Sequence, residues 1–299
     1  MPEGDTVWRT AHRLDTALRG AELTRSDLRW PSVAELDLRG ASTVGVVPRG
    51  KHLLHRLDTG LTIHSHLRME GQWRVVATPE LTARSLADSM LRAALGTMAW
   101  TALGLRLGML DVVPTAAEHT LVGHLGPDVL DPAAETADMV AAVERAPGTI
   151  AEALLDQRLL AGIGTFYACE SLFLTGTHPW SAAARLDPEA LGGIIERART
   201  LMRANLPHAV QSTTGLRAPG QRSYVHGRLA LPCRRCGEPV RVSGSSGSGP
   251  PSTQERAIFY CPTCQGGLAP ADRGEPQRPL GSSPRRGVRQ PTRTPRTSH

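Results

Sequence analysis

Apolar side chains recur with a helical period in the first twenty residues. They are three or four positions apart, which is the spacing of one buried helix face: Val7, Ala11, Leu14 and Leu18. Asp5 or Thr6 is expected to cap this helix, and Gly20 is expected to end it. The chain is therefore predicted to open with an amphipathic helix.

The pattern then changes to a period of two. Between about residues 22 and 113, short alternating segments such as 53–57 and 61–67 are separated by glycine, proline and aspartate. Many short segments with this punctuation are typical of antiparallel strands in a sandwich. We expect a β-sandwich there, flanked by the N-terminal helix.

Helical spacing returns after the turn-rich segment 114–136. Thr149-Ile150-Ala151-Glu152 has the pattern of a capping box, which opens a helix directed toward Leu160. The glycine-marked turn 161–164 interrupts this helix, a further helix begins at Thr165, and another covers about 188–205. The second half is therefore predicted to be helical.

Four of the five cysteines form two C-x-x-C pairs near the C-terminus. Cys233 and Cys236 are separated from Cys261 and Cys264 by 24 residues, and each pair can bring two thiolates to one ion. Four thiolates with no open position favour one structural Zn²⁺ per chain, in a small ribbon that is too poor in apolar residues to fold alone. The fifth cysteine, Cys169, is expected to be a buried small apolar residue.

Small and polar residues dominate two segments that we expect to be flexible. The first, 243–252, consists largely of glycine, serine and proline and is expected at the tip of the ribbon hairpin. The second, 268–299, is expected to be a disordered basic tail. Residues 270–299 carry +5 of the formal net charge of +6, so the rest of the chain is almost neutral. Net charge alone does not identify a nucleic-acid-binding protein.

Composition narrows the class of protein further. A chain of 299 residues with 40% hydrophobic positions can bury two modest cores. Its first residues lack the pattern of a signal peptide, and no segment is long and apolar enough to cross a bilayer, so we expect a cytoplasmic protein with no membrane partner. Lys51 is the only lysine among 34 lysines and arginines. An amine, unlike a guanidinium, can be tuned by burial to exchange a proton, so Lys51 is either a reactive group or a surface lysine retained by chance.

Five separated motifs stand in a specific order along the chain. They are Met1-Pro2-Glu3-Gly4, Arg49-Gly50-Lys51-His52-Leu53-Leu54, His66-Leu67-Arg68-Met69-Glu70-Gly71, Leu155-Asp156-Gln157 with Ala161-Gly162-Ile163-Gly164, and Val225-His226-Gly227-Arg228. Arg256 follows them, five residues before the second cysteine pair. Together these segments resemble the formamidopyrimidine-DNA glycosylase/endonuclease VIII family, from residue 1 to about 267.

The resemblance, together with the periodicities, implies an α+β multidomain fold. We expect an N-terminal catalytic β-sandwich domain with flanking helices at 1–115, a linker at 116–136, and a helix-two-turn-helix DNA-binding domain at 137–225. A zinc-finger hairpin at 226–267 and the tail at 268–299 follow. The implied partner is damaged double-stranded or single-stranded DNA, bound between the domains by a monomer that is associated with the nucleoid of a bacterial-type cell.

The resemblance places the chemistry at the N-terminus. Removal of Met1 exposes the secondary amine of Pro2, and because an α-amino group has a pKa of about 7.7–8, part of it is unprotonated at neutral pH. Attack of this amine on the sugar C1′ would expel the damaged base and leave an iminium, from which the 3′ phosphate can be eliminated. Glu3 is the expected general acid and base.

Four residues are implied to contact DNA. Lys51 is expected to contact a phosphate and to assist proton transfer, and Arg256 to clamp the phosphate beside the lesion and so support catalysis. Met69 is the expected wedge that fills the gap left by an extruded base, although a strand-core methionine is an alternative. Thr165 stands where the family usually has a phosphate-binding asparagine, and its hydroxyl offers fewer donors.

The paired His64 and His66 are explained by the two-residue period of a strand, and we do not assign them as metal ligands.

Gly4-Asp5 resembles the endonuclease VIII branch more than the purine-directed branch. We therefore expect a base-excision-repair DNA glycosylase with AP lyase activity that removes oxidised bases, preferably pyrimidines, through a Schiff base at Pro2 and β/δ-elimination. A glycosylase directed at 8-oxoguanine and formamidopyrimidines is the alternative with the same fold. Two alternatives of another class are a non-catalytic DNA-binding member, which the intact Pro2, Glu3 and Lys51 disfavour, and a generic zinc-ribbon module, which leaves the first 230 residues unexplained.

Overall fold

The first helix, α1 (Gly4–Leu18), buries the predicted apolar face. The structure, a computed structural model, describes residues 2–247 and 256–277. Glu3 occupies the N-cap position of α1 and makes no capping hydrogen bond with its side chain, so the predicted caps Asp5 and Thr6 are wrong. The carboxylate of Glu3 is directed instead to a distant helix, as described below.

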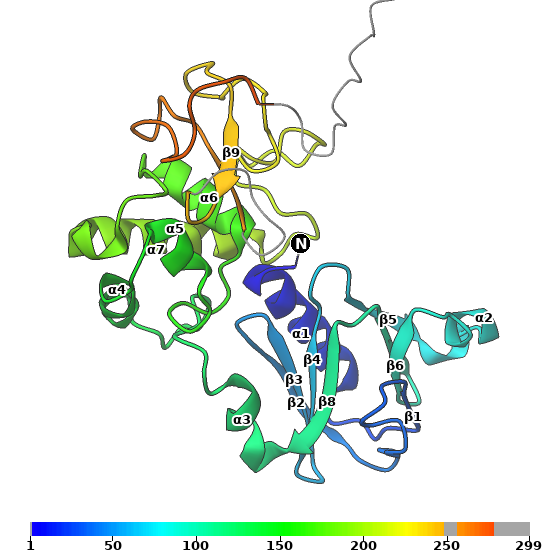
Figure 1. The fold of residues 1–299 in the computed structure, drawn as a ribbon. Helices are drawn as coiled ribbons and strands as arrows, with labels where there is room; N and C mark the ends of the chain where they lie inside the picture. Colours follow the sequence, from blue (N-terminus) through cyan, green and yellow to red (C-terminus); the bar gives the residue numbers. More distant parts are fainter. Residues whose placement is uncertain (1, 248–255, 278–299) are drawn as a thin grey trace, which may run out of the picture.

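Two four-stranded antiparallel sheets follow α1 and form the predicted sandwich (Figure 1). One has the order β2-β3-β4-β8: β2 (Thr43–Arg49), β3 (His52–Leu57), β4 (Leu61–His66) and β8 (Met109–Pro114). The other has the order β1-β6-β7-β5: β1 (Arg25–Leu28), β6 (Leu91–Gly96), β7 (Trp100–Leu105) and β5 (Gln72–Ala77). One core joins them to α1, because the inward residues of both sheets and the apolar face of α1 belong to the same buried cluster.

Short helical turns accompany the second sheet and the connection to the next domain. They are the 3-10 helix η1 (Thr78–Glu80), α2 (Ala83–Leu86), the 3-10 helix η2 (Thr115–Ala117) and α3 (His119–Val122). Val122 packs in a small cluster with Leu54 of β3 and with Ala161 from the helical half. The connection therefore lies against the outer face of the first sheet.

The second half is helical, as predicted. It contains α4 (Thr136–Glu144), α5 (Ile150–Leu155), α6 (Thr165–Leu174), the 3-10 helix η3 (Ala183–Arg185) and α7 (Pro188–Asn205). The capping box is confirmed, since the Glu152 amide donates to Thr149 Oγ1 (3.1 Å) and the Thr149 amide to Glu152 Oε2 (2.9 Å). Helix α5 ends earlier than expected, because Asp156 adopts an extended conformation. Residues 165–173 of α6 are all buried, so α6 is the central helix of this half.

The ribbon is a two-stranded antiparallel pair, β9 (Arg241–Gly244) with β10 (Ala257–Tyr260), and its apolar residues belong to the same core as α6. Figure 1 shows the ribbon above the helices, with the start of α1 at the junction between the sandwich and the helical half. The odd cysteine, Cys169, is fully buried as predicted.

The prediction that residues 243–252 and 268–299 are flexible is partly wrong. Residues 243–247 are packed against the helical half, where Trp180 Nε1 donates to the Gly244 carbonyl oxygen (2.9 Å) and Thr149 Oγ1 donates to that of Ser245 (3.1 Å). The remainder of that segment, 248–252, lies outside the described residues. Within 268–277, Asp272 pairs with Arg241 at 2.6 Å, and the two side chains are 7% and 8% exposed. A buried arginine requires such a partner, which fixes this part of the tail. The rest of the predicted tail, 278–299, lies outside the described residues.

Across the described part of the chain, no helix is long and apolar enough to cross a membrane.

Candidate active site

Glu3 is buried at the N-terminus of α6, in the other half of the molecule. Its carboxylate accepts backbone hydrogen bonds from Gly164 (2.8 Å), Phe166 (2.8 Å) and Tyr167 (3.4 Å). These are the free amides of a helix N-terminus, which favour a negative charge. Burial nevertheless raises the pKa of Glu3, and the opposing effects of Lys51 and of the amides do not offset it fully. A carboxyl with a raised pKa is suited to give and take a proton.

Three glycines allow this close contact between the two halves. The Gly4 amide donates to the Gly162 carbonyl oxygen (2.9 Å). A Cβ atom on Gly164 would lie 2.5 Å from Glu3 Cδ, and one on Gly4 would lie 2.7 Å from Met202 Cε and 3.1 Å from Gly162 Cα. The glycine-marked turn therefore holds the N-terminus of the chain against α6, a role that its sequence alone did not reveal.

Lys51 lies at the turn between β2 and β3. The turn is tied to the other half because the Gly50 amide donates to Asp128 Oδ2 (2.6 Å). Burial lowers the pKa of the Lys51 ammonium, the charge of Glu3 raises it, and that of Arg256 lowers it. Asp128 is a positioning residue that the sequence analysis missed, since no local pattern links residue 128 to residue 50.

A pocket of about 460 Å³ lies between the sandwich and the helical half. It brings together five of the residues predicted for catalysis or DNA binding: Pro2, Lys51, Met69, Thr165 and Arg256. Glu3 is fully buried and does not line the pocket, although its neighbour Pro2 does. We call this hollow the lysine pocket. Its polar lining also includes His52, His66, Arg68 and Gln157, which the sequence analysis gave no role of their own.

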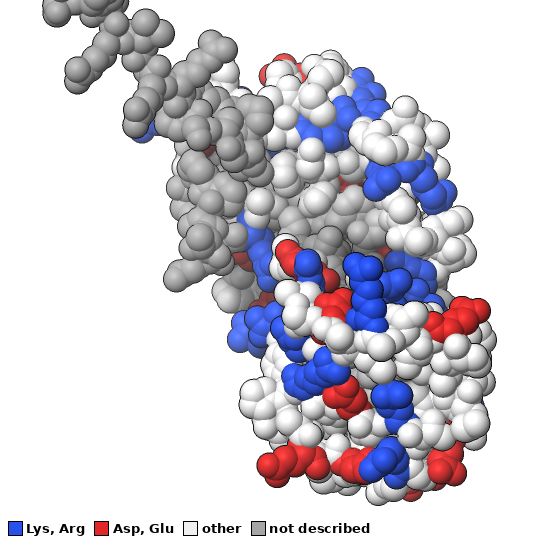
Figure 2. All heavy atoms as spheres, turned by 90° about the vertical axis from the view of Figure 1, so that its right-hand side faces the viewer, with Lys and Arg blue, Asp and Glu red and all other residues white. Residues whose placement is uncertain are grey.

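Met69 is at the rim of the lysine pocket, in the turn between β4 and β5. Its side chain is 63% exposed, so the alternative of a strand-core methionine is wrong. Nearby arginines line a shallow hollow on the sandwich: Arg68, Arg92 and Arg106. Figure 2 shows basic side chains over the middle and the upper part of one face, with acidic ones interspersed among them and along its lower edge. This surface suits a polyanion better than the small net charge of residues 1–269 suggested.

A second pocket, of about 550 Å³, adjoins Pro2 on its other side. We call it the 213–227 pocket, because much of its wall comes from that segment. Its polar lining consists of Thr6, Arg9, Gln211, Arg222, Ser223, His226 and Arg228. No local pattern in the sequence indicates this pocket, since it forms between α1 and residues some two hundred positions away.

Glu170 of α6 fixes the segment that walls this second pocket. Its buried carboxylate accepts backbone hydrogen bonds at 2.8 Å from each of Tyr224, Val225 and His226, and it is also bonded to the hydroxyl of Thr213. Burial is the largest effect on the pKa of Glu170 and raises it, while these hydrogen bonds lower it. Both ends of the segment are thus attached to one side chain of the central helix.

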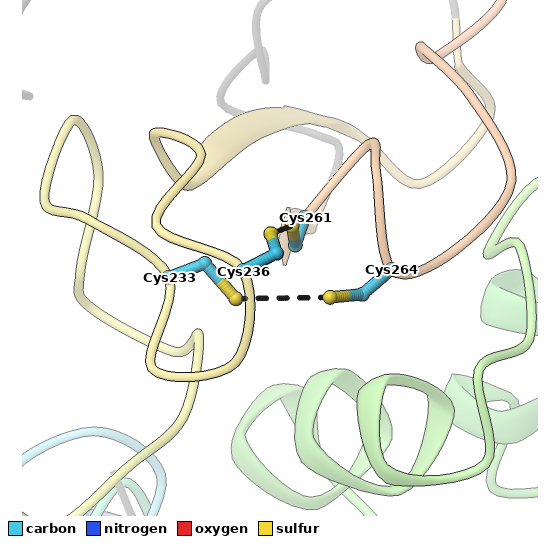
Figure 3. Close-up of side chains that lie close together, drawn as sticks. All are labelled: Cys233, Cys236, Cys261 and Cys264. Atoms are coloured by element: carbon cyan, nitrogen blue, oxygen red, sulfur yellow. Dashed lines mark hydrogen bonds between the residues drawn. The ribbon is translucent and has the colours of Figure 1, made fainter.

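The four predicted metal ligands are brought together in the ribbon (Figure 3). Their Sγ atoms all lie within 4.8 Å of one another, with Cys236 and Cys261 3.4 Å apart and Cys233 and Cys264 3.9 Å apart. A tetrahedral Zn²⁺ with Zn–S bonds of about 2.3 Å separates its sulfurs by about 3.8 Å. The cluster therefore fits one tetrahedral ion with four thiolate ligands.

Comparison with known proteins bears on both halves of the chain. The model of the formamidopyrimidine-DNA glycosylase N-terminal domain matches residues 1–101, and that of the H2TH domain matches residues 125–216. A probable endonuclease 8 2 of Streptomyces coelicolor is 47% identical over 290 residues, which cover 96% of this chain and all of that protein. The DNA-(apurinic or apyrimidinic site) lyase Nei2 of Mycolicibacterium smegmatis is 39% identical, over 89% of this chain and 99% of that protein.

Among solved structures, the formamidopyrimidine-DNA glycosylase of Lactococcus lactis, non-covalently bound to DNA with an AP site, is similar in fold. The TM-score is 0.72 at 19% identity, over 89% of this chain and all of that one. The fold and the sequence relatives define a DNA glycosylase with AP lyase activity, an enzyme of base excision repair. The chain belongs to the formamidopyrimidine-DNA glycosylase/endonuclease 8 family.

Proposed function

We propose that the amine of Pro2 attacks the sugar C1′ of a damaged nucleotide, with Glu3, Lys51 and Arg256 assisting, and that oxidised pyrimidines are the preferred bases. The observation that carries this proposal is the position of Pro2, which lines both pockets. A nucleophile placed there can reach a sugar whose phosphates lie on one side and whose base lies on the other.

The lysine pocket is suited to the DNA backbone. Lys51 and Arg256 supply positive charge at its wall, and Thr165 supplies a hydroxyl at the N-terminus of α6. His66 adds a donor, because its Nδ1 accepts the Arg68 amide (2.9 Å) and its Nε2 must then carry the hydrogen. Such groups bind phosphate oxygens and set the register of the strand. Met69, exposed at the rim, is placed to fill the space of an extruded base.

The 213–227 pocket is suited to the extruded base. Gln211 lines it, and its amide nitrogen donates to Asp5 Oδ1 (2.7 Å), which leaves the amide oxygen as an acceptor for a ring N–H. Asp5 belongs to the Gly4-Asp5 pair that resembles the endonuclease VIII branch, so its contact with Gln211 supports a preference within the family. The related protein from Streptomyces coelicolor is named an endonuclease 8, in agreement with this branch. A purine-directed activity is the alternative that a panel of lesions decides.

Pro2 and Glu3 act in successive steps of the proposed reaction. The Pro2 nitrogen forms a bond to C1′ and gives up its proton, while the bond between C1′ and the base breaks and the base leaves as a protonated species. Glu3, with its raised pKa, is the group that gives and takes these protons. The C1′–O4′ bond then breaks as O4′ takes up a proton, which opens the sugar ring and leaves an iminium between Pro2 and C1′. The iminium makes the C2′ hydrogen acidic, and loss of this proton expels the 3′ phosphate. Water then releases Pro2 from the cleaved strand.

We further propose that the ribbon binds one structural Zn²⁺ through Cys233, Cys236, Cys261 and Cys264. When bound, the ion fixes the ribbon, and Arg256 lies five residues from one of its ligands. The chain would act as a monomer on damaged duplex or single-stranded DNA, in the cytoplasm and at the nucleoid.

Borohydride trapping on DNA with an abasic site tests the nucleophile. The chain has two kinds of amine, the N-terminus and its only lysine, Lys51, so mapping the reduced adduct by mass spectrometry gives a two-way answer. We expect the adduct on Pro2, in protein whose mass shows that Met1 is removed, and we expect it to persist in Lys51→Arg. An adduct on Lys51 would overturn the proposal. No adduct at all, from protein that binds the DNA, would favour the non-catalytic alternative.

A further inference from the structure

Two histidines and an aspartate form a row on one face of the first sheet. In the registers of β3, β4 and β8, His52 is opposite His66, and His64 is opposite Asp111. His52 Nδ1 lies 2.8 Å from His64 Nε2, and His64 Nδ1 lies 3.4 Å from Asp111 Oδ2. The strand period explains the spacing of His64 and His66, as expected, but it does not explain why His64 joins His52 and Asp111 in one chain of contacts.

The carboxylate at one end fixes the tautomers of both rings. Asp111 can only accept while it is ionised, so His64 carries its hydrogen on Nδ1 and its Nε2 is a bare acceptor. His52 must then donate from Nδ1 to His64, which leaves His52 Nε2 without a hydrogen. The His66 ring packs edge-to-face against His52, but it is outside this chain of hydrogen bonds because its Nδ1 accepts the Arg68 amide.

The row runs from the pocket to the surface. His52 lines the lysine pocket beside Lys51, the His64 side chain is 1% exposed, and the Asp111 side chain is 36% exposed. Asp111 is not among the residues that line the lysine pocket, so its partly exposed carboxylate reaches water outside that pocket. A proton can therefore pass along these three side chains between the pocket and water.

The surroundings keep both rings neutral at rest. Burial lowers the pKa of His52 to about 3, helped by the positive forms of His66, His64, His124 and Lys51. Burial also lowers the pKa of His64, against the opposing effect of Asp111. A neutral ring with one bare nitrogen accepts a proton there and releases another from its opposite nitrogen.

We propose that His52, His64 and Asp111 form a proton path from the lysine pocket to solvent, and that His52 Nε2 is the group that takes up the proton released during elimination. This inference rests on the proposed function, which supplies the proton that leaves C2′.

Each transfer balances. A proton from the pocket bonds to His52 Nε2 while the Nδ1 proton of His52 moves to His64 Nε2. The Nδ1 proton of His64 then moves to Asp111, whose carboxyl releases a proton to water. Rotation of the two rings then restores the starting tautomers, with the proton left in water. No redox partner or further reactant is needed.

The experiment compares His64→Gln with His55→Gln in single-turnover cleavage of abasic-site DNA. A glutamine at position 64 can accept from His52 and donate to Asp111, but it cannot transmit a proton. His55 is a matched control, because it is also buried, also has a pKa lowered to about 4 by burial, and is bonded to Thr43 away from this row. Formation of the trapped adduct is measured separately from strand cleavage.

We expect His64→Gln to slow elimination at least about tenfold, to leave adduct formation unchanged and to be rescued by added imidazole. Asp111→Asn should slow the same step, because an amide that donates to His64 Nδ1 reverses both tautomers and puts a hydrogen on His52 Nε2. His55→Gln should not slow elimination selectively, and imidazole should not accelerate it.

Elimination at the wild-type rate in His64→Gln, or a slow rate that imidazole does not restore, would overturn the proton path. Failure of the wild-type protein to form an adduct would instead count against the proposed function, so the two failures are distinguishable.

Discussion

The Phe166 amide donates to the carboxylate of Glu3 at 2.8 Å, although 163 positions separate them in the chain. Glu3, the residue beside the proposed nucleophile Pro2, is thereby held by the first turn of α6 rather than by its own helix. The protonation of Glu3 consequently depends on how the sandwich and the helical half are assembled, because the burial that raises its pKa comes from both.

The fall of kcat/KM at high pH should follow the deprotonation of Lys51. Its charged form is the one that binds phosphate, and burial lowers its pKa, so kcat/KM should begin to fall at a pH below the ordinary lysine value of about 10.4. Lys51→Arg retains the charge at all these pH values, and the fall should move to higher pH. The measurement is kcat/KM on abasic-site DNA as a function of pH. A fall at the same pH in the variant would show that another group titrates.

Gly164→Ala should damage the site directly. The added Cβ would lie 2.5 Å from Glu3 Cδ, whose carboxylate is held by hydrogen bonds from backbone amides, so we expect a loss of roughly 1–3 kcal/mol in the free energy of unfolding and a large loss of base excision. Gly193→Ala is the matched control, since nothing lies within 4 Å of its added Cβ in α7. That substitution should stabilise by about 0.5–1 kcal/mol, as alanine favours a helix. Urea unfolding and single-turnover excision check both, and a neutral Gly164→Ala would contradict the packing.

Glu170→Gln should slow excision of a damaged base much more than cleavage at a preformed abasic site. A glutamine cannot accept all the hydrogen bonds that hold residues 224–226, so the 213–227 pocket should loosen and excision of a damaged base should fall by roughly tenfold or more. Cleavage at a preformed abasic site, which has no base to bind, should change by less than about twofold.

Glu196→Gln is the control for Glu170→Gln, because Glu196 is paired with Arg199 on α7 and lies outside both pockets. Equal losses of excision and of abasic-site cleavage in Glu170→Gln would show that Glu170 only maintains the fold.

Met69→Ala tests the proposal that Met69 fills the space left by an extruded base. Because the side chain is 63% exposed, the free energy of unfolding should change by less than about 0.5 kcal/mol. Affinity for duplex DNA with a lesion should nevertheless fall by roughly fivefold, about 1 kcal/mol, as the space of the extruded base is left unfilled. Met98→Ala, which removes a methionine that is 80% exposed near the β6–β7 turn, should leave affinity unchanged. Equal Kd values for Met69→Ala and the wild type would refute the assignment.

Removal of the metal should abolish binding of DNA before it unfolds the sandwich. Cys236→Ser is expected to lower the zinc content below one ion per chain and to weaken binding of abasic-site DNA, because Arg256 is anchored by the same ribbon. Cys169→Ala, at the buried cysteine outside the cluster, should keep its zinc. Metal analysis measures the zinc content, and a titration measures the affinity for abasic-site DNA. One zinc ion per chain in Cys236→Ser would contradict the proposal that Cys236 is a ligand.

Local signals in the sequence predicted the elements well. The capping box at Thr149 and the helix at about 188–205 were confirmed, because residues a few positions apart decide how a helix begins. The motif residues Pro2 and Lys51 were also brought together in one pocket.

Contacts between distant segments could not be predicted in this way. The carboxylate of Glu3 accepts hydrogen bonds at the N-terminus of α6 instead of capping α1. Asp128 accepts the Gly50 amide and so holds the turn before Lys51. Arg241 likewise fixes residues around Asp272 that looked disordered by composition. In each case a buried charged group finds its partner through the packing of segments that lie far apart in the sequence, and no periodicity records that packing.

The lysine pocket draws on the chain from residue 2 to residue 256. During synthesis Pro2, the proposed nucleophile, is made long before Arg256, the proposed phosphate ligand. A chain that stalls before the ribbon would therefore carry the amine and Lys51 but not Arg256. Its lysine pocket would lack the part of the wall that residue 256 supplies, so the pocket is complete only once the ribbon has been made.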